Sequence, residues 1–426
     1  MQRWAGLRSR LQYEPGFWHV GHLHCPPHLK PMSTARSVDL SPKGLLSDSG
    51  NYVLQQDDIA SLARYVWAGV LLPGDTDTLQ QRLNVSTATM RKLSEVVTPL
   101  LATFNDVKAH CETFKDKTYP SIVSIADDIY SYAQDAGGTE QNSYYANILR
   151  CIRSLATASS KPEKDDLKQT IDSLCDGLIK NATAIQTKIQ EVVENVSKFG
   201  DQTYEDSSAL KERKLAVEDM LTSDAGSLEA LQRQLEENHT ELKADQAEYE
   251  HDRIVASTAL TYAWVPFLGV ITSSVVAAAS GRAAAAMAER IKLVNRLIAE
   301  ETDEAGSRTG VVTDERRIVA DLISVDMDFD SLLAAVGPAT HLIQVVLAAF
   351  QAISGQLANL KDLVNTDPSK ANAAIKKIVD SKVVDGWNAL ANAVDKYREA
   401  AFVTPVQEIS LDQLSQQLQK QVGTAA

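Results

Sequence analysis

Apolar residues recur at intervals of three and four along most of the chain, the spacing that places them on one face of an α-helix. No segment shows the strict alternation expected of a half-buried strand. Pro, Gly and helix-capping residues divide the pattern into separate helices. The pattern predicts a helix from Asp57 to the Pro73-Gly74 break, one from Ser86 to about Gln134 with kinks at Pro99 and Pro120 and an end at Gly137-Gly138, and one from Tyr144 to Ala158. A long helix begins at Lys161. Two more run from Asp314 to about Leu363 with a kink at Pro338, and from Ala371 to Ala401 after an Asp367-Pro368 start.

Within the helix that begins at Lys161, apolar residues recur every seven positions, which is the spacing of a coiled-coil seam. Leu174, Ile189 and Val196 fill positions between them. The pattern pauses at residues 222–226. The composition there fits a break between two helices and an exposed part of one continuous helix equally well. We expect this seam to join helices of one chain rather than to bind a partner. Its members are Ile171, Leu178, Ile185, Val192 and Phe199.

One stretch interrupts this periodic pattern, because residues 254–281 contain no charged side chain although 23% of the whole chain is charged. Pro266 and Gly269 stand at its centre, where they weaken a continuous helix. The two halves are rich in Ala, Ser, Thr and Gly, the small residues that let helices approach closely in lipid. We interpret the stretch as an apolar helical hairpin at the end of a helical rod. A buried hairpin in the core of an ordinary helical domain is the alternative.

The tip of this hairpin is the candidate membrane-insertion site. Each arm of about 12 residues reaches about 18 Å as a helix, whereas the hydrocarbon core of a bilayer is about 30 Å thick. Arg253 and Arg282 oppose deeper entry by roughly 2.5–3.5 kcal/mol each at the bilayer centre. We therefore expect shallow insertion into one leaflet, and a tip that is partly shielded before it meets a membrane. The site comprises Tyr262, Trp264, Val265, Pro266, Phe267, Leu268, Gly269, Val270 and Ile271.

These patterns together predict an all-α fold, in which an elongated multi-helix tail bundle carries a long coiled-coil neck and an apolar helical-hairpin head. Two long helices flank the hairpin, so its tip lies far from the remaining helices. The predicted parts are a disordered N-terminal extension and lead-in at 1–51, tail-bundle helices at 52–205, a neck coiled coil with the head hairpin at 206–305, and C-terminal helices that return to the tail bundle at 306–426.

Residues 1–31 differ from the rest because they are basic and lack helical periodicity. They contain no apolar segment of the kind that a secretory signal peptide requires, so we expect release of a soluble protein without one. The natural chain is expected to begin at Met32. A histidine-rich cluster in this segment matches no established zinc spacing, and no metal site is predicted. The cluster consists of His19, His22, His24, Cys25 and His28.

The net charge of −14 argues against nucleic acid as a partner, because a phosphate binder needs a basic face. It also gives no attraction to anionic lipid, so membrane affinity must come from apolar contact or a receptor. The four cysteines lie far apart without C-x-x-C spacing, which indicates reduced, mostly buried thiols. They are Cys25, Cys111, Cys151 and Cys175.

The chain shows no nucleophile elbow, P-loop, H-E-x-x-H helix or dinucleotide-binding glycine motif. Acidic pairs such as Asp57-Asp58 and Asp127-Asp128 fit solvated helix faces better than paired catalytic carboxylates. The sequence therefore predicts a protein that is not an enzyme and needs no cofactor.

Two segments carry a resemblance to a known family. The run VLQQDDIASLARYVWAGVLLP at residues 53–73 is similar to the first tail helix of the cytolysin A-type α-helical pore-forming toxins, and WVPFLG at 264–269 is similar to their head. More narrowly, the chain resembles the A component of the α-xenorhabdolysin binary toxins, from Val53 to the C-terminus. The resemblance implies a soluble protein that meets a target-cell membrane through its head and assembles with a B component into a ring-shaped pore.

Two other classes of function stay open on the sequence. A one-component pore former would need no partner. A non-toxic coiled-coil scaffold or membrane-shaping protein would use the hairpin as a dimerisation seam.

Overall fold

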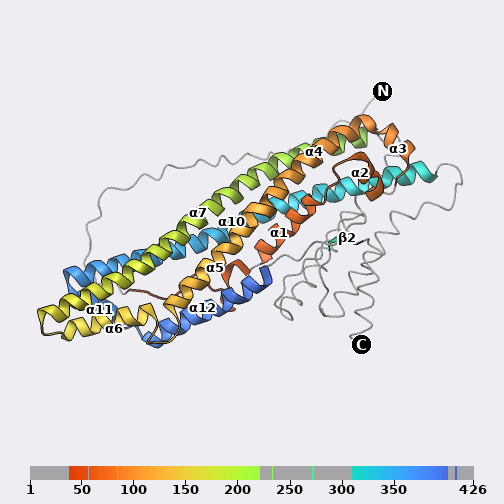
Figure 1. Cartoon of the computed structure of the whole chain (residues 1–426). Helices are drawn as coiled ribbons and strands as arrows, with labels where there is room; N and C mark the ends of the chain where they lie inside the picture. The colour runs from red at the N-terminus through yellow and green to blue at the C-terminus, as the bar shows by residue number, and fades with distance from the viewer. Residues whose placement is uncertain are drawn as a thin grey trace, which may run out of the picture. The chain divides into compact units, whose positions relative to one another are not determined.

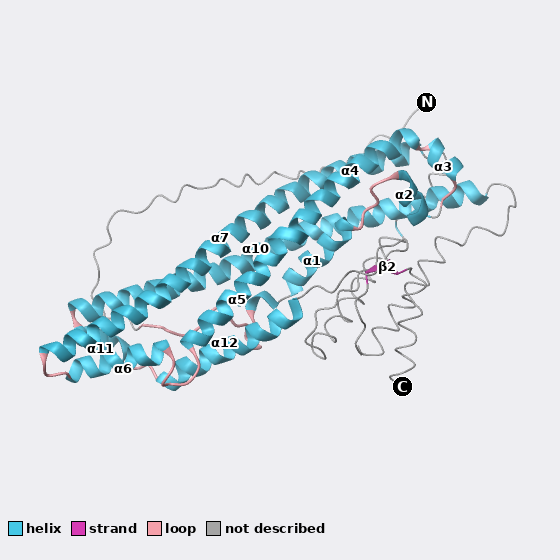
Figure 2. Ribbon diagram, in the orientation of Figure 1, coloured by secondary structure: helices cyan, strands magenta, loops and turns pink. Residues whose placement is uncertain are grey.

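The computed structural model describes residues 38–55, 57–83, 85–220, 233, 271–272, 309–401 and 408–409. The chain divides into two compact units, Met1–Arg36 and Ser37–Ala426, and every described residue belongs to the second. Figure 2 shows that helices dominate this unit. Its elements are η1 (Val53–Gln55), α1 (Asp57–Val70), α2 (Thr76–Leu83), α3 (Thr87–Lys92), α4 (Ser94–Thr113), the π-helical turn η2 (Phe114–Thr118), α5 (Tyr119–Ala136), α6 (Tyr144–Thr157), α7 (Lys161–Met220), β1 (Ile271–Thr272), α10 (Thr309–Thr366), α11 (Pro368–Ile375), α12 (Asp380–Ala401) and β2 (Glu408–Ile409).

The longest helices, α7 and α10, share the most extensive interface among the described elements (Figure 1). With 60 residues, α7 is about 90 Å long. All five predicted seam residues of α7 are buried, and α4, α5, α6 and α10 all contact this helix. The seam therefore packs within the chain, as predicted. The described helices form an elongated bundle, and the predicted all-α class is confirmed.

Two predicted helix starts are confirmed by their capping geometry. The Ser86 hydroxyl accepts a hydrogen bond from the backbone N–H of Thr89 at 3.2 Å, and it caps α3. A carboxylate oxygen of Asp367 accepts one from the N–H of Lys370 at 3.1 Å, and Pro368 follows in the first turn of α11. Both residues satisfy backbone donors that a helix start leaves without intrahelical partners.

The single helix predicted from Ser86 to about Gln134 is divided in the structure. Leu93 separates α3 from α4, and the π-helical turn η2 separates α4 from α5. The turn lies directly before Pro120, which has no N–H to donate to the carbonyl of Asp116, so a wider turn fits there. The sequence prediction also passed over α2, although Leu79 and Leu83 stand one helical turn apart.

The helix predicted from Ala371 to Ala401 is also interrupted, because α11 ends at Ile375 and α12 begins at Asp380. Arg153 of α6 supplies the tertiary reason. Its guanidinium donates to the backbone carbonyl of Ile378 at 3.2 Å and to the Asp380 carboxylate at 2.7 Å. The Arg153 guanidinium thus supplies a donor to the Ile378 carbonyl, which would accept a backbone N–H in a continuous helix.

The lead-in before η1 was expected to be flexible, but its described part packs against the bundle. Leu40 and Leu45 are buried, and the Leu40 carbonyl accepts a hydrogen bond from the Trp387 indole at 2.8 Å. Trp387 also stacks on Tyr145 with ring centroids 5.6 Å apart. The lead-in is therefore part of the aromatic core that joins α6 and α12. The other predicted domain boundaries stay predictions.

Candidate functional site

The predicted membrane-insertion residues fall almost wholly outside the described residues. Among them the structure describes Ile271, which begins strand β1. The remaining eight keep their role as a prediction: Tyr262, Trp264, Val265, Pro266, Phe267, Leu268, Gly269 and Val270.

The described structure shows the helices that precede and follow that segment in the sequence. Helix α7 ends at Met220 and α10 begins at Thr309, so these two helices bracket the apolar stretch 254–281. We call their adjoining parts, residues 203–220 of α7 and 309–330 of α10, the head-proximal end of the bundle. This end immediately precedes and follows the undescribed residues around the stretch in the sequence, so its contacts are the described geometry nearest to the stretch along the chain.

Two lysines tie the last turns of α7 to α10. The Lys214 ammonium lies 3.1 Å from the Asp326 carboxylate, and both side chains are largely buried. Lys211 lies 2.7 Å from Asp330 and 4.0 Å from Asp326. The hydrogen bond to Asp330 raises the pKa of Lys211 above its ordinary value. The paired charges fix the register of α7 against α10 at the head-proximal end of the bundle.

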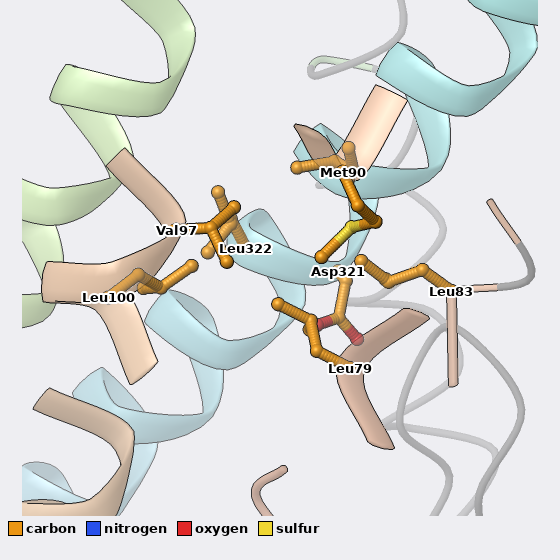
Figure 3. Close-up of a pocket in the computed structure, with 8 residues that line it drawn as sticks. Leu79, Leu83, Met90, Val97, Leu100, Asp321 and Leu322 are labelled. Carbon is orange, nitrogen blue, oxygen red and sulfur yellow. The ribbon is translucent and has the colours of Figure 1, made fainter. Parts of the chain in front are cut away.

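A buried ion pair binds α2 to α10. Arg82 donates from Nε and Nη2 to Oδ1 of Asp321 at 3.0 and 2.9 Å, and from Nη1 to the Leu71 carbonyl at 3.4 Å. The exposed fractions of the two charged side chains are 7% and 2%. Figure 3 shows the Asp321 carboxylate surrounded by apolar side chains. A carboxylate in such a place is costly unless it is paired, so Arg82 and Asp321 depend on each other.

A second carboxylate of α10 binds α3. One oxygen of Asp314 accepts from the backbone N–H of Ser86 at 2.9 Å and from the Thr89 hydroxyl at 2.8 Å. Asp314 is also buried. We call α2 and α3 together the strap, because Asp314 and Asp321 hold them across the first turns of α10.

Beneath the strap lies a small cavity of about 10 Å³, room for about one water molecule. Its walls come from α2, α3, α4 and α10, and apolar side chains dominate them (Figure 3). A cavity of this size is a gap between packed helices and is too small to admit a substrate. The lining residues are Leu79, Leu83, Met90, Val97, Leu100, Ile318, Asp321 and Leu322.

A histidine–carboxylate pair joins α4 to α7 at the same end. Nδ1 of His110 lies 2.9 Å from Oδ2 of Asp206. Burial raises the pKa of the Asp206 carboxyl, and the hydrogen bond from His110 opposes that shift. The pair stands one turn before the π-helical turn η2, where the hydrogen-bonding pattern of α4 changes.

Signals for these residues in the sequence are weak. Arg82 stands between Leu79 and Leu83, and Asp321 is the one acid in the apolar run IVADLISV at 318–325. A single charge in an apolar run signals burial with a partner, but the partner of Asp321 lies 239 residues away.

Among the described residues no group of three His, Cys, Asp or Glu side chains could hold a metal ion. The predicted histidine cluster at 19–28 lies outside the described residues. The three described cysteines are free thiols, with Cys111 and Cys175 buried as expected and Cys151 half-buried.

One segment of the described chain, Phe329–Thr366 of α10, is long and apolar enough to cross a membrane by length and composition. A core helix of a soluble protein passes the same test, and this segment packs against α7, so the result is weak evidence for a span.

Comparison with known proteins places this geometry in context. Residues 76–245 match the family described as Bacillus haemolytic enterotoxin (HBL). This match takes in the strap and α7 but does not reach α10. No curated protein sequence matches the chain.

Solved structures match nearly the whole chain. The HblL1 toxin component of Bacillus cereus superposes with a TM-score of 0.58 at 14% identity, covering 87% of this chain and all of its own. The soluble SmhA of the tripartite α-pore-forming toxin Smh from Serratia marcescens gives 0.56 at 14% identity, covering 86% and 96%. The soluble AhlB of the tripartite α-pore-forming toxin AHL from Aeromonas hydrophila gives 0.53 at 12% identity, covering 86% and 99%.

At these identities the similarity establishes the fold, which the chain shares with these toxin components over nearly their full length. The matched family and the matched structures are named as toxins or toxin components.

Proposed function

We propose that this chain is a subunit of a multi-component α-helical pore-forming toxin. The observation that carries the proposal is the fold, because 86% of the chain matches the soluble components AhlB and SmhA of tripartite α-pore-forming toxins. The family match over residues 76–245 supports it independently at the level of sequence. The long α7–α10 pair also brackets an uncharged stretch, as a membrane-binding head requires.

Within the assembly, this chain takes the role of the membrane-binding subunit. Its net charge of −14 gives no attraction to anionic lipid, so the apolar tip supplies the affinity. Burial of Trp264 and Phe267 would contribute roughly 1.5–3 kcal/mol apiece. The short arms on either side of the tip favour anchoring in one leaflet, and a partner subunit then provides the helices that span the bilayer.

The partner is a B component that joins this chain in a ring-shaped hetero-oligomer. The resemblance to α-xenorhabdolysin A components favours two kinds of subunit. AhlB and SmhA belong to tripartite toxins, which favours three. Lysis of erythrocytes by mixtures of candidate subunits separates the two arrangements, because a tripartite toxin stays inactive until the third component is added.

Leakage from dye-loaded phosphatidylcholine vesicles tests the proposal. The chain alone should bind vesicles without leakage, and addition of the partner subunit should start leakage. Leakage by the chain alone would assign it to the one-component pore formers. Absence of both binding and leakage, with and without partner, would favour the coiled-coil scaffold and overturn the proposal.

A matched pair of variants tests the role of the tip. Replacement of Trp264 and Phe267 by Ser should abolish vesicle binding and leave the helical content unchanged. The control is Tyr204→Ser with Leu215→Ser, because these large side chains of α7 are 68% and 60% exposed in the described structure. If both double variants lose binding equally, exposed apolar area in general and not the tip binds the membrane.

A further inference from the structure

The three longest rods of the described bundle each contain a feature that weakens a helix. These rods are α7, α10 and the succession of α4, η2 and α5 (Figure 1). In the succession the feature is η2 itself, where the Tyr119 N–H donates to the Phe114 carbonyl, and Pro120 follows. Turns of this kind and prolines are the usual places at which long helices bend.

In α7 the weakening feature is Gly200, and in α10 it is the pair Gly337-Pro338. Glycine weakens a helix because its backbone loses the most freedom when the helix forms. Pro338 has no N–H to donate to the Ala334 carbonyl, and both Gly337 and Pro338 are exposed. Burial therefore does not oppose a change in the direction of α10 at this point.

Two contacts bring these features together at one level of the bundle. The rings of Phe114 and Phe199 lie 4.5 Å apart, centroid to centroid, and both side chains are buried. Phe199 precedes Gly200, and a Cβ atom added at Gly200 would lie 2.8 Å from Cγ1 of Val336, the residue before Gly337. The weak points of the three rods are thus adjacent in space. We call them the central level, which consists of residues 114–118, 199–200 and 336–338.

Polar contacts hold the rods together on both sides of the central level. On the head-proximal side, His110 binds Asp206, and the lysine–aspartate pairs described above join α7 to α10. On the other side, the Gln186 amide donates to the Phe350 carbonyl at 3.0 Å and to the Ser354 hydroxyl at 2.9 Å. The two contacts within the level are apolar, so they can shift without loss of a hydrogen bond.

We propose that the central level is a hinge, at which the head-proximal end of the bundle bends as one body relative to the rest of the bundle. A hinge needs two bodies that are each held together and a connection that yields, and the contacts above supply both. The hinge is a property of the bundle and goes beyond the proposed function. Its use, bending of the head-proximal end when the protein binds a membrane, rests on the proposed function.

Hydrogen exchange followed by mass spectrometry tests the hinge in the full-length chain. Peptides at 114–121, 198–205 and 335–342 should exchange at least about fivefold faster than the peptide at 185–192, the factor that corresponds to one helical glycine. The comparison peptide also belongs to α7 and carries buried residues of its seam. Equal protection of all four peptides would overturn the hinge.

A stiffened variant tests whether the rods yield together. Gly337→Ala with Pro338→Ala restores a backbone N–H, and the Cβ atom at 337 meets no described atom within 4 Å. Exchange should slow in 335–342 and also in 198–205, which carries no substitution. The matched control is Gly355→Ala, another position of α10 where an added Cβ meets no described atom within 4 Å.

The control should leave exchange in 198–205 at the wild-type rate. Slowing that is confined to α10 in the stiffened variant would show that the weak points open independently, which overturns the hinge. Equal slowing of 198–205 by the control would do the same, because the effect would then follow from the stability of α10 in general.

A second variant approaches the hinge from α7. Gly200→Ala with Val336→Ala stiffens α7 and removes the Cγ1 atom that the new methyl group would meet. Exchange should then slow in 114–121, which contacts α7 through Phe114 and Phe199. An unchanged rate in 114–121 would contradict a hinge shared by the three rods.

The use of the hinge is tested by the same measurement on wild type with phosphatidylcholine vesicles, with cosedimentation as the measure of binding. In the bound protein the three peptides of the central level should exchange faster than in solution, and 185–192 should keep its rate. Binding without any change at the central level would overturn the use of the hinge in membrane binding. Absence of binding would overturn the proposed membrane role, whereas the hinge itself is decided by the measurements in solution.

Discussion

Arg82 and Asp321 are 239 positions apart in the sequence and share two hydrogen bonds, from Nε and Nη2 to the same carboxylate oxygen at 3.0 and 2.9 Å. The pair fastens the strap to the first part of α10, 12 residues after that helix begins at Thr309. Both side chains are nearly inaccessible to water. The stability of this end of the bundle therefore depends on a charge pair and not on apolar packing alone.

Arg82→Ala should destabilise the protein by about 3–5 kcal/mol, because it leaves the Asp321 carboxylate buried without its partner. Urea denaturation followed by circular dichroism measures the change. Hydrogen exchange should show the largest loss of protection in α2 and α3.

The control for this prediction is the double variant Arg82→Met with Asp321→Leu. Replacement of both charges by apolar side chains of similar size should recover most of the lost stability. If Arg82→Ala changes the free energy of unfolding by less than about 0.5 kcal/mol, the pair is solvated in solution and the strap is held by its leucines.

Ile185→Asp should cost several kcal/mol, because Ile185 is 3% exposed in the α7 seam and the new carboxylate would have no partner there. Ala184→Asp, on the exposed face of the same turn, is the matched control and should change little. Thermal unfolding of the monomer checks both. Unchanged monomer stability with lost assembly would instead place the seam in a contact with a partner subunit.

Thiol reactivity should distinguish the described cysteines. Burial raises the pKa of the Cys175 thiol to about 12 and that of Cys111 further above its ordinary value. Since the thiolate is the reactive form, both should resist iodoacetamide in the native protein. Cys151 is less buried and should react first in a Cys25→Ser background. Labelling of Cys111 before Cys151, detected by peptide mapping, would show that α4 opens in the native state.

Asp206 should give stability a specific dependence on pH. Burial raises the pKa of this carboxyl in the folded protein, so the folded state holds the proton more tightly than the unfolded chain. Its contribution is then fully present below the unfolded pKa of about 3.9 and is lost as pH rises through the higher folded pKa. The stability of wild type relative to Asp206→Asn should fall over that window. A rise over the same window would mean that the His110 hydrogen bond outweighs burial.

The depth of the head is set by the position of Trp264 in the membrane. Brominated lipids should quench its fluorescence most strongly when the bromine lies near the interface. Trp4 and Trp18 are first replaced by Phe. Trp67 and Trp387 are buried in the bundle, so they serve as a constant background, and the further Trp264→Phe variant measures that background directly. Strongest quenching by bromine near the bilayer midplane would contradict shallow anchoring and favour a chain that forms pores by itself.

Local signals in the sequence were sufficient for most helices. The apolar spacing of α7, the caps at Ser86 and Asp367, and the breaks at Pro73 and Gly137 all act within a few residues, so they can be recognised without knowledge of the fold. The heptad seam could be assigned for the same reason. The break between α11 and α12 could not, because it depends on Arg153 from another helix.

The sequence by itself therefore determined the all-α class, the long helices and the uncharged stretch between α7 and α10. Only the tertiary structure decided which segments hold that stretch and its flanking helices. Asp314 and Asp321 bind a strap that is more than 220 residues distant, and β1 pairs with a strand from the C-terminal part of the chain. Hydrogen bonds and ion pairs between distant residues leave no periodic trace in a sequence, because their energy depends on burial and geometry that exist only after the helices have packed.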